Sequence, residues 1–173
     1  NAATGKTVTL TNTYAGADAG NYAITDQTTA TDNIAQAALT ISGITAANKT
    51  YDGNTSATVS TGSVVKGGLI AGDTVTVSSS GVFADKNAAT GKTVTLTNTY
   101  AGADAGNYAI TDQTTATANI AQAALTISGI TAANKTYDGN TSATVSTAGV
   151  VKSGLVVGDT VTLASSGVFA DKN

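Results

Sequence analysis

The sequence predicts an all-β fold built from repeated domains, and three observations support this prediction. The polar residues are mostly Thr, Ser, Asn and Gly, the apolar ones are mostly Ala and Val, and only 11% of residues are charged. Thr and Val favour half-buried strands, whereas the residues that usually fill exposed helix faces are nearly absent. Several segments alternate apolar and polar residues, and the whole sequence repeats itself at a fixed interval.

The repeat is the strongest of these signals. The stretch that begins at Asn1 begins again at Asn87, which gives a period of 86 residues. Such a unit is too long for one coil of a solenoid and long enough to bury its own core, so we expect one domain per period. The two copies differ at eight positions, of which seven lie between 62 and 78 of the first copy. The differing pairs are Asp32/Ala118, Gly62/Ala148, Ser63/Gly149, Gly67/Ser153, Ile70/Val156, Ala71/Val157, Val77/Leu163 and Ser78/Ala164.

The domain boundary is predicted within TATANIAQAALTISGI, residues 115–130, an Ala-rich stretch with few turn residues. On this phasing residues 1–37 are the C-terminal part of one repeat, 38–123 are a complete repeat, and 124–173 are the N-terminal part of the next. A sequence without Met is expected to be a segment of a longer polypeptide. Incomplete repeats leave strand edges open, so we expect the two ends to associate head to tail between molecules.

Alternating segments define the strands of the complete repeat, each with one apolar face and one mostly hydroxyl face. The residues predicted to face the core are Leu39, Ile41, Val75, Val77, Val94, Leu96, Tyr100, Tyr108, Ile110, Ala116, Ala118 and Ile120. Gly43 breaks the alternation before Ile44, which indicates a bulge or bend. About seven short strands separated by turn residues favour an immunoglobulin-like β-sandwich of antiparallel sheets. A β-grasp-like repeat with one short helix is the alternative, since SVVKGGLIAG, residues 63–72, does not alternate.

The segment NKTYDGNTSAT occurs at 48–58 and again at 134–144. Its Asp-Gly-Asn run tolerates positive φ, which predicts a hairpin turn. A Tyr beside such a turn usually packs its ring at the rim of the core and bonds its hydroxyl to the backbone. A structural turn motif is therefore predicted at Tyr51, Asp52, Gly53, Tyr137, Asp138 and Gly139.

The charges exclude several classes of partner. Eight Lys and eleven Asp give a net charge of −3, and neither sign forms a run. A nucleic-acid partner is not expected, because no basic stripe could neutralise phosphates. Insertion of this segment into a membrane is not expected either, since no apolar stretch approaches the roughly 20 residues of a span. The partners expected are the neighbouring repeats of the same chain.

Catalysis and metal binding have few candidate residues. The sequence contains no His, Cys or Glu, so we do not expect an enzyme. Calcium is the one cofactor considered, because carboxylates in predicted loops are the ligands that it prefers. The weak calcium candidates are Asp52, Asp73, Asp85, Asp104 and Asp112, of which the first four are expected instead to cap turns. A Lys–Asn isopeptide bond would require Lys49 or Lys92 to lie buried beside an Asn and a carboxyl group.

Five motifs in fixed order resemble a known repeat family. They are KTYDGNTSA, GLIAGDTVTV, GVFADKNAATGKTVTL, GADAGNYAI and TATANIAQAALTI, and together they cover essentially the whole period. This series resembles the YDG-type tandem repeat of large bacterial surface adhesins, including filamentous-haemagglutinin-like proteins. The resemblance implies a structural stalk or spacer repeat on an extracellular or cell-surface protein, and it implies no catalytic residue.

A binding function is the alternative to a spacer. Each repeat could be a weak module for a glycan, a surface or ice, made strong by the number of copies. The row Thr93, Thr95, Thr97 and Thr99 would suit an ice or sugar surface, although such a row on a twisted sheet is more often a solvated face. Asp32, which stands where the next copy has Ala118, has no role under either hypothesis.

Overall fold

The computed structural model describes residues 1–172, and almost all of its regular structure is β. The strands of the first two thirds are β1 (Ala3–Thr9), β2 (Thr29–Ile34), β3 (Ala37–Ser42), β4 (Thr45–Ala46), β5 (Lys49–Thr50), β6 (Ser56–Ala57), β7 (Val59–Ser60), β8 (Val65–Gly67), β9 (Thr76–Phe83), β10 (Ala89–Ala101), β11 (Tyr108–Thr111) and β12 (Thr115–Ala121). The remaining strands are β13 (Thr126–Ser128), β14 (Thr131–Ala132), β15 (Ser142–Ala143), β16 (Val145–Ser146), β17 (Val151–Ser153) and β18 (Gly167–Val168). The helices of the described chain are two three-residue 3-10 turns, η1 (Ala19–Asn21) and η2 (Ala105–Asn107). The predicted all-β class is confirmed.

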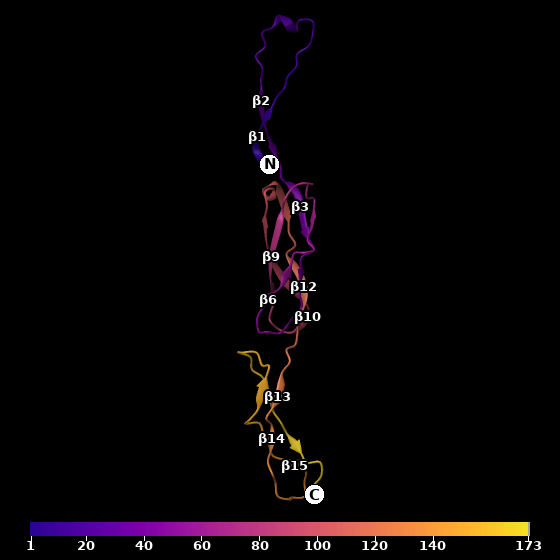
Figure 1. Cartoon of the computed structure of the whole chain (residues 1–173), viewed down its shortest axis with the longest axis vertical. Coiled ribbons are helices and arrows are strands. Elements are labelled where there is room, and N and C mark those ends of the chain that lie inside the picture. Colours follow the sequence, from indigo (N-terminus) through magenta and orange to yellow (C-terminus); the bar gives the residue numbers. More distant parts are fainter. Residues whose placement is uncertain (173) are drawn as a thin grey trace. The chain divides into compact units, whose positions relative to one another are not determined.

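Residues 37–121 form two main sheets, whose longer strands are labelled in Figure 1. One has five strands in the order β5-β12-β10-β9-β6, and the other has three in the order β11-β3-β8. This arrangement is compatible with a β-sandwich. The expectation of purely antiparallel sheets was wrong, because β11 runs parallel to β3 and β12 runs parallel to β5. Parallel pairing requires a long connection, and the paired strands here are far apart in the sequence.

The core follows the predicted alternation. The buried apolar residues are Leu39, Ile41, Ile44, Val75, Phe83, Val94, Leu96, Tyr108, Ala118 and Ile120. Val77, Tyr100, Ile110 and Ala116 were predicted to face the core and are half-buried. The break at Gly43 is also present: this residue has a φ of 82°, and an added Cβ would lie 2.4 Å from the carbonyl oxygen of Ser63.

The helical alternative for residues 63–72 is wrong. This stretch contains β8, which pairs antiparallel with β3. Gly68 then adopts a φ of 94°, and a Cβ there would approach the carbonyl oxygen of Ala38 to 2.5 Å. The glycines therefore allow the chain to turn closely over β3, and this close approach leaves no room for a helix.

The chain forms two compact units. One consists of Asn1–Ala46, Thr58–Gly81 and Thr95–Ala116, and its core holds Leu39, Ile41, Ile44, Val75, Leu96 and Tyr108. The other consists of Ala47–Ala57, Val82–Val94 and Thr117–Asn173, and its core holds Phe83, Val94, Ala118 and Ile120. Within residues 1–172, no helix has the length and hydropathy of a membrane span.

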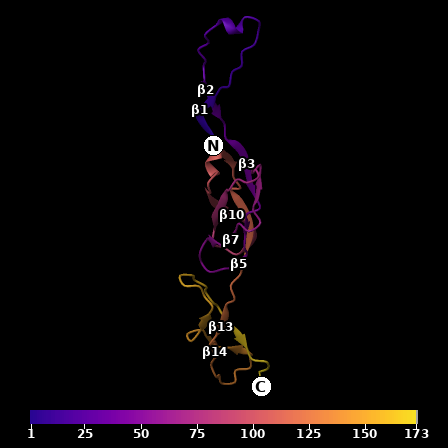
Figure 2. The same ribbon diagram turned by 45° about the horizontal axis from the view of Figure 1, so that its top comes forward.

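The segments at the two ends keep only pairings internal to themselves. At the N-terminal end β1 pairs antiparallel with β2, and Figures 1 and 2 show this pair in indigo, joined by a long loop that contains η1. At the C-terminal end the pairs are β13 with β17, β14 with β16 and β15 with β18. The boundaries at 37/38 and 123/124 stay predictions, and the last residue of 124–173 lies outside the described residues.

Two equivalent leucines that differ in burial allow the packing of the two copies to be compared within one molecule. Leu39 is fully buried, whereas Leu125, its counterpart 86 residues later, is half-buried. Leu39→Ala is expected to lower the free energy of unfolding by about 2–5 kcal/mol, because it leaves a cavity in a packed core. Leu125→Ala is expected to cost clearly less. Urea denaturation of the two variants measures the difference, and equal losses would show that the two copies are equally packed.

Candidate functional site

The two Tyr-Asp-Gly turns have the same internal bonding. Lys49 Nζ lies 2.6 Å from the carboxylate of Asp52 and donates to Asn54 Oδ1 at 3.0 Å and to the carbonyl of Ser56 at 3.2 Å. In the second copy the corresponding residues are Lys135, Asp138, Asn140 and Ser142, with distances that differ by no more than about 0.1 Å. Each turn is therefore a local structure organised by a lysine, as its short sequence spacing allows.

The turn differs from the prediction in its conformation and its pairing. Gly53 has positive φ, at 81°, but Asp52 and Asn54 do not. The strands on either side do not pair with each other, since β5 and β6 are the two edge strands of the five-stranded sheet. The predicted hairpin was therefore wrong: the turn crosses the end of the sheet from one edge to the other.

Tyr51 has a tertiary role that differs from the predicted bond to the backbone, whereas Tyr137 is 69% exposed. Tyr51 donates its hydroxyl proton to Asp159 Oδ2 at 2.6 Å, and Lys86 Nζ donates to Oδ1 of the same carboxylate at 3.2 Å. The ammonium of Lys86 also lies 5.9 Å from the centre of the Tyr51 ring. These bonds, first that from Tyr51, hold the pKa of Asp159 below its usual value. Tyr51 and Asp159 are 108 residues apart, which is more than one period of 86 residues, so this contact links successive copies of the repeat.

A second tyrosine and carboxylate are bonded inside the complete repeat. Tyr108 is buried, donates to Asp73 Oδ2 at 2.5 Å and accepts a bond from the backbone N–H of Ile70 at 3.0 Å. Burial, together with the bond to Asp73, raises the pKa of Tyr108. Asp73 is the counterpart of Asp159, so the same aspartate position bonds a tyrosine in both copies, although the tyrosine comes from a different motif.

The five calcium candidates are spread over several places in the fold, and of these Asp73 and Asp104 both lie near Tyr108. Asp52 and Asp85 are each bonded to a lysine and to a backbone N–H two residues on, as expected of turn caps. Asp104 instead bonds the distant N–H of Thr74, and Asp112, which lies between β11 and β12, bonds Tyr100 and Asn98 of β10. Among residues 1–172, no three acidic, His or Cys side chains gather in a way that could hold a metal ion.

The two candidate lysines for an isopeptide bond each contact an aspartate. Lys92 Nζ lies 2.7 Å from Asp85 Oδ1, and Lys49 has the carboxylate and carbonyl partners described above. The lysine bonds lower the pKa of both Asp52 and Asp85, so these carboxyl groups are charged. Lys49 thus lies beside both a carboxylate, that of Asp52, and an Asn side chain, that of Asn54, so the arrangement named above is present at the turn, where both partners are exposed.

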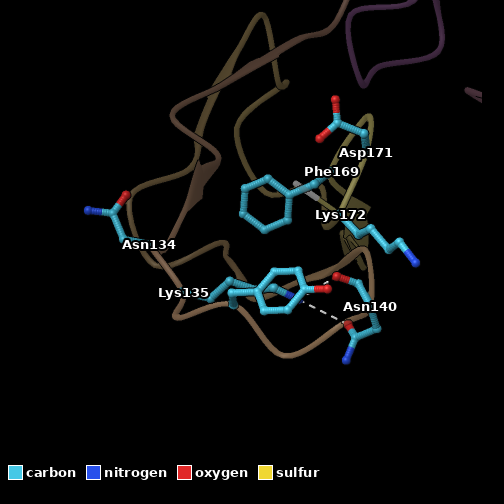
Figure 3. A pocket seen from close by; sticks show the side chains of 7 residues that line it. Asn134, Lys135, Asn140, Phe169, Asp171 and Lys172 are labelled. Carbon is cyan, nitrogen blue, oxygen red and sulfur yellow. Dashed lines mark hydrogen bonds between the residues drawn. The ribbon is translucent and has the colours of Figure 1, made fainter.

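Two cavities lie among the residues of the second compact unit. The first, of about 330 Å³, is lined by residues that include Asn134, Lys135, Tyr137, Asn140, Phe169 and Lys172. Figure 3 shows Lys135 bonded to Asn140, with Phe169 across from it, and the ammonium lies 5.7 Å from the centre of that ring. The second cavity, of about 490 Å³, is lined by Tyr51, Asn87, Ala88, Gln122, Ala123 and Leu125.

Comparison with protein families matched most of the chain to one family model. The family described as YDG domain matches residues 35–117 and 121–173. Comparisons with curated proteins and with solved structures found no match.

Tyr108 and its exposed counterpart Tyr22 allow the stability contributed by the buried hydroxyl to be measured with two matched variants. Tyr108→Phe is expected to lower Tm by about 5–15 °C, because it removes a buried hydroxyl that has both a donor and an acceptor partner. Tyr22→Phe, at the exposed counterpart, is expected to leave Tm unchanged within error at a protein concentration where the chain is monomeric. Differential scanning calorimetry of the two variants checks this, and equal Tm values would mean that the hydroxyl of Tyr108 contributes no stability.

Tyr100 gives a prediction at high pH. Burial, with the bond from its hydroxyl to Asp112, raises the pKa of Tyr100 from 10.0 to about 12. A group whose folded pKa is raised stabilises the fold at pH values below its unfolded pKa, and this contribution is lost as the pH rises through the folded value. Stability should therefore fall between pH 10 and about 12, and Tyr100→Phe should make that fall less steep. Urea denaturation across this range measures both slopes, and identical slopes would contradict the assignment.

Proposed function

We propose that this chain, which belongs to the YDG domain family, is a structural spacer of a bacterial cell-surface or secreted adhesin of the filamentous-haemagglutinin-like kind. In this proposal each repeat is a folded unit without a site of its own, and the array extends a distal binding domain away from the cell. The location is extracellular, and the partners of each repeat are its neighbours in the chain. Membership of the family supports a repeat of this type, and the adhesin context is our extension of it.

The contact at Asp159 is the main support for this proposal. Its carboxylate receives bonds from Tyr51 and Lys86, which belong to the preceding copy of the repeat. A bond to a charged group is stronger than a neutral one, and two bonds to one carboxylate restrict its orientation. Gly53 adds close packing there, since a Cβ at this position would lie 2.9 Å from Val156 Cγ1. Specific contacts between successive copies are what a stiff array requires.

A non-catalytic role fits the available side chains. The sequence lacks His, Cys and Glu, and its aspartates and lysines are largely paired with each other or with tyrosines. Nucleic acid is not proposed as a partner, because the net charge is negative and no basic stripe is present.

The competing proposal is a weak binding module repeated many times. It draws on Tyr137 and Phe169, two exposed aromatic side chains beside the first cavity. In the preceding copy, however, Phe83 is buried and Tyr51 is half-buried and bonded to Asp159. The aromatic pair is thus exposed only at the end segment, and the spacer proposal accounts for more of the structure.

Copy number separates the two proposals. The chain is lengthened by one, two and three further periods of 86 residues, and each product is studied at a concentration where it is monomeric. A spacer predicts that the maximum dimension from small-angle X-ray scattering rises by a constant increment, about 35 Å for strands of this length. It also predicts that retention on glycan-coated or ice surfaces does not change. Retention that rises steeply with copy number would support multivalent binding instead.

A further inference from the structure

The C-terminal segment exposes residues that its counterpart buries. Residues 124–173 repeat residues 38–87 with seven substitutions, and they keep the same internal strand pairs. Yet Ile130 is 43% exposed where Ile44 is 3% exposed, and Phe169 is 39% exposed where Phe83 is 2% exposed. Neither pair involves a sequence difference, so the exposure depends on what packs against these residues and not on their identity.

The N-terminal segment shows the complementary pattern. The hairpin of residues 1–34 repeats residues 87–120 with a single substitution, at Asp32. Ile34 is 51% exposed where Ile120 is 2% exposed, and Tyr22 is 72% exposed where Tyr108 is 3% exposed. In the complete repeat, residues 87–121 supply the partners that bury the 38–86 half.

Both cavities lie where such a partner is absent. In the complete repeat Asn48 Oδ1 accepts a bond from the N–H of Asn119 on β12, whereas its counterpart Asn134 lines the first cavity. The second cavity is lined by Asn87, Ala88 and Gln122. Their counterparts one period earlier are Asn1, Ala2 and Gln36, all of which bond residues of η2. A hairpin that brings β2 and η1, the counterparts of β12 and η2, would fill both cavities.

We infer that residues 124–173 are a receptor for the hairpin of residues 1–34 of a second copy of this chain, so that chains join head to tail. The docked hairpin adopts the contacts that residues 87–121 make with residues 38–86. This inference concerns an interaction surface of the chain itself and does not depend on the proposed spacer function.

The docked state has defined hydrogen bonds, each taken from a bond in the complete repeat. Gln113 bonds both the N–H and the carbonyl of Ile44, so Gln27 bonds Ile130 of the second copy. Tyr108 bonds Asp73, so Tyr22 bonds Asp159, which is already bonded by Tyr51 and Lys86. A carboxylate accepts up to about four hydrogen bonds, so the third partner can be accommodated.

Strand pairing provides the rest of the interface. Residues Tyr108–Thr111 form β11 against β3, whereas their counterparts, residues 22–25, form no strand. Likewise β10 has 13 residues and its counterpart β1 has seven. Docking therefore extends β1 and converts residues 22–25 into a strand parallel to residues 123–126 of the second copy.

Asp32 opposes this docking and provides a sensitive test. It lies opposite Lys6 in the β1·β2 pair and is exposed, but its counterpart Ala118 is buried. A docked hairpin must bring this carboxyl group into a buried position, which is costly. Asp32→Ala makes the hairpin identical to residues 87–120, and it is expected to lower the dissociation constant of self-association by about tenfold or more.

Two blocking variants test the direction of assembly. Ile34→Lys places a charge on the hairpin, and Ile130→Lys places one in the receptor; both side chains are exposed in the single chain, so each variant should fold. Val151→Lys is the control, because Val151 and its counterpart Val65 are both exposed, so docking does not bury this position. Mass is measured by sedimentation velocity over a dilution series.

The expected outcome is specific. The wild type, Val151→Lys and Asp32→Ala form chains whose mass grows with concentration, and each blocked variant alone stays monomeric. A mixture of the two blocked variants forms only dimers, because one intact hairpin meets one intact receptor and both remaining ends are blocked. A wild type and an Asp32→Ala variant that stay monomeric at every concentration overturn the inference. Self-association of Ile130→Lys alone also overturns it, because pairing would then occur through another surface.

Discussion

The fold of the complete repeat depends on pairing between two halves that are distant in the sequence. β11 runs parallel to β3, and β12 runs parallel to β5. Both pairings join residues 37–50 to residues 108–121. β5 and β11 are edge strands of their sheets, so without these pairings β12 and β3 would each have an unpaired edge. Closing such a loop costs chain entropy, which only the burial of the shared core can offset. The side-chain bonds of Tyr108 and Gln113, and the bond from the N–H of Asn119 to the side chain of Asn48, follow from this closure.

The two ends of the chain show what happens when this closure is absent. Hairpin pairs and local turns persist there, but the apolar faces that the second half would cover are exposed. The same amino acids are thus core residues in one copy and surface residues in another. Exposed apolar faces beside open strand edges favour association with a complementary segment. For a tandem array, this means that the structural unit is defined by pairing between halves rather than by the sequence period.

Aspartates organise the polar contacts of the repeat. Asp73 bonds Tyr108 within one repeat, and Asp159, at the same position in the next copy, bonds Tyr51 and Lys86 of the preceding repeat. An aspartate with two acceptor oxygens can hold a tyrosine of its own repeat and residues of a neighbour at once. Asp52 and Asp85, in contrast, pair with lysines a few residues away and fix individual turns. The acidic residues that resembled metal ligands in the sequence therefore have structural partners.

The sequence by itself determined the all-β class, the period of 86 residues, the apolar face of each strand and the bonding of the Tyr-Asp-Gly turns. These features depend on alternation and on contacts within about seven residues, as the matching bonds of Lys49 and Lys135 show. Only the tertiary structure decided the parallel pairings, the edge-to-edge path of the turn and the partners of Tyr51 and Tyr108. Those contacts join residues 35 to 108 positions apart. Turn chemistry carries no information about which distant strand will pack alongside, because that choice depends on how the whole core is filled.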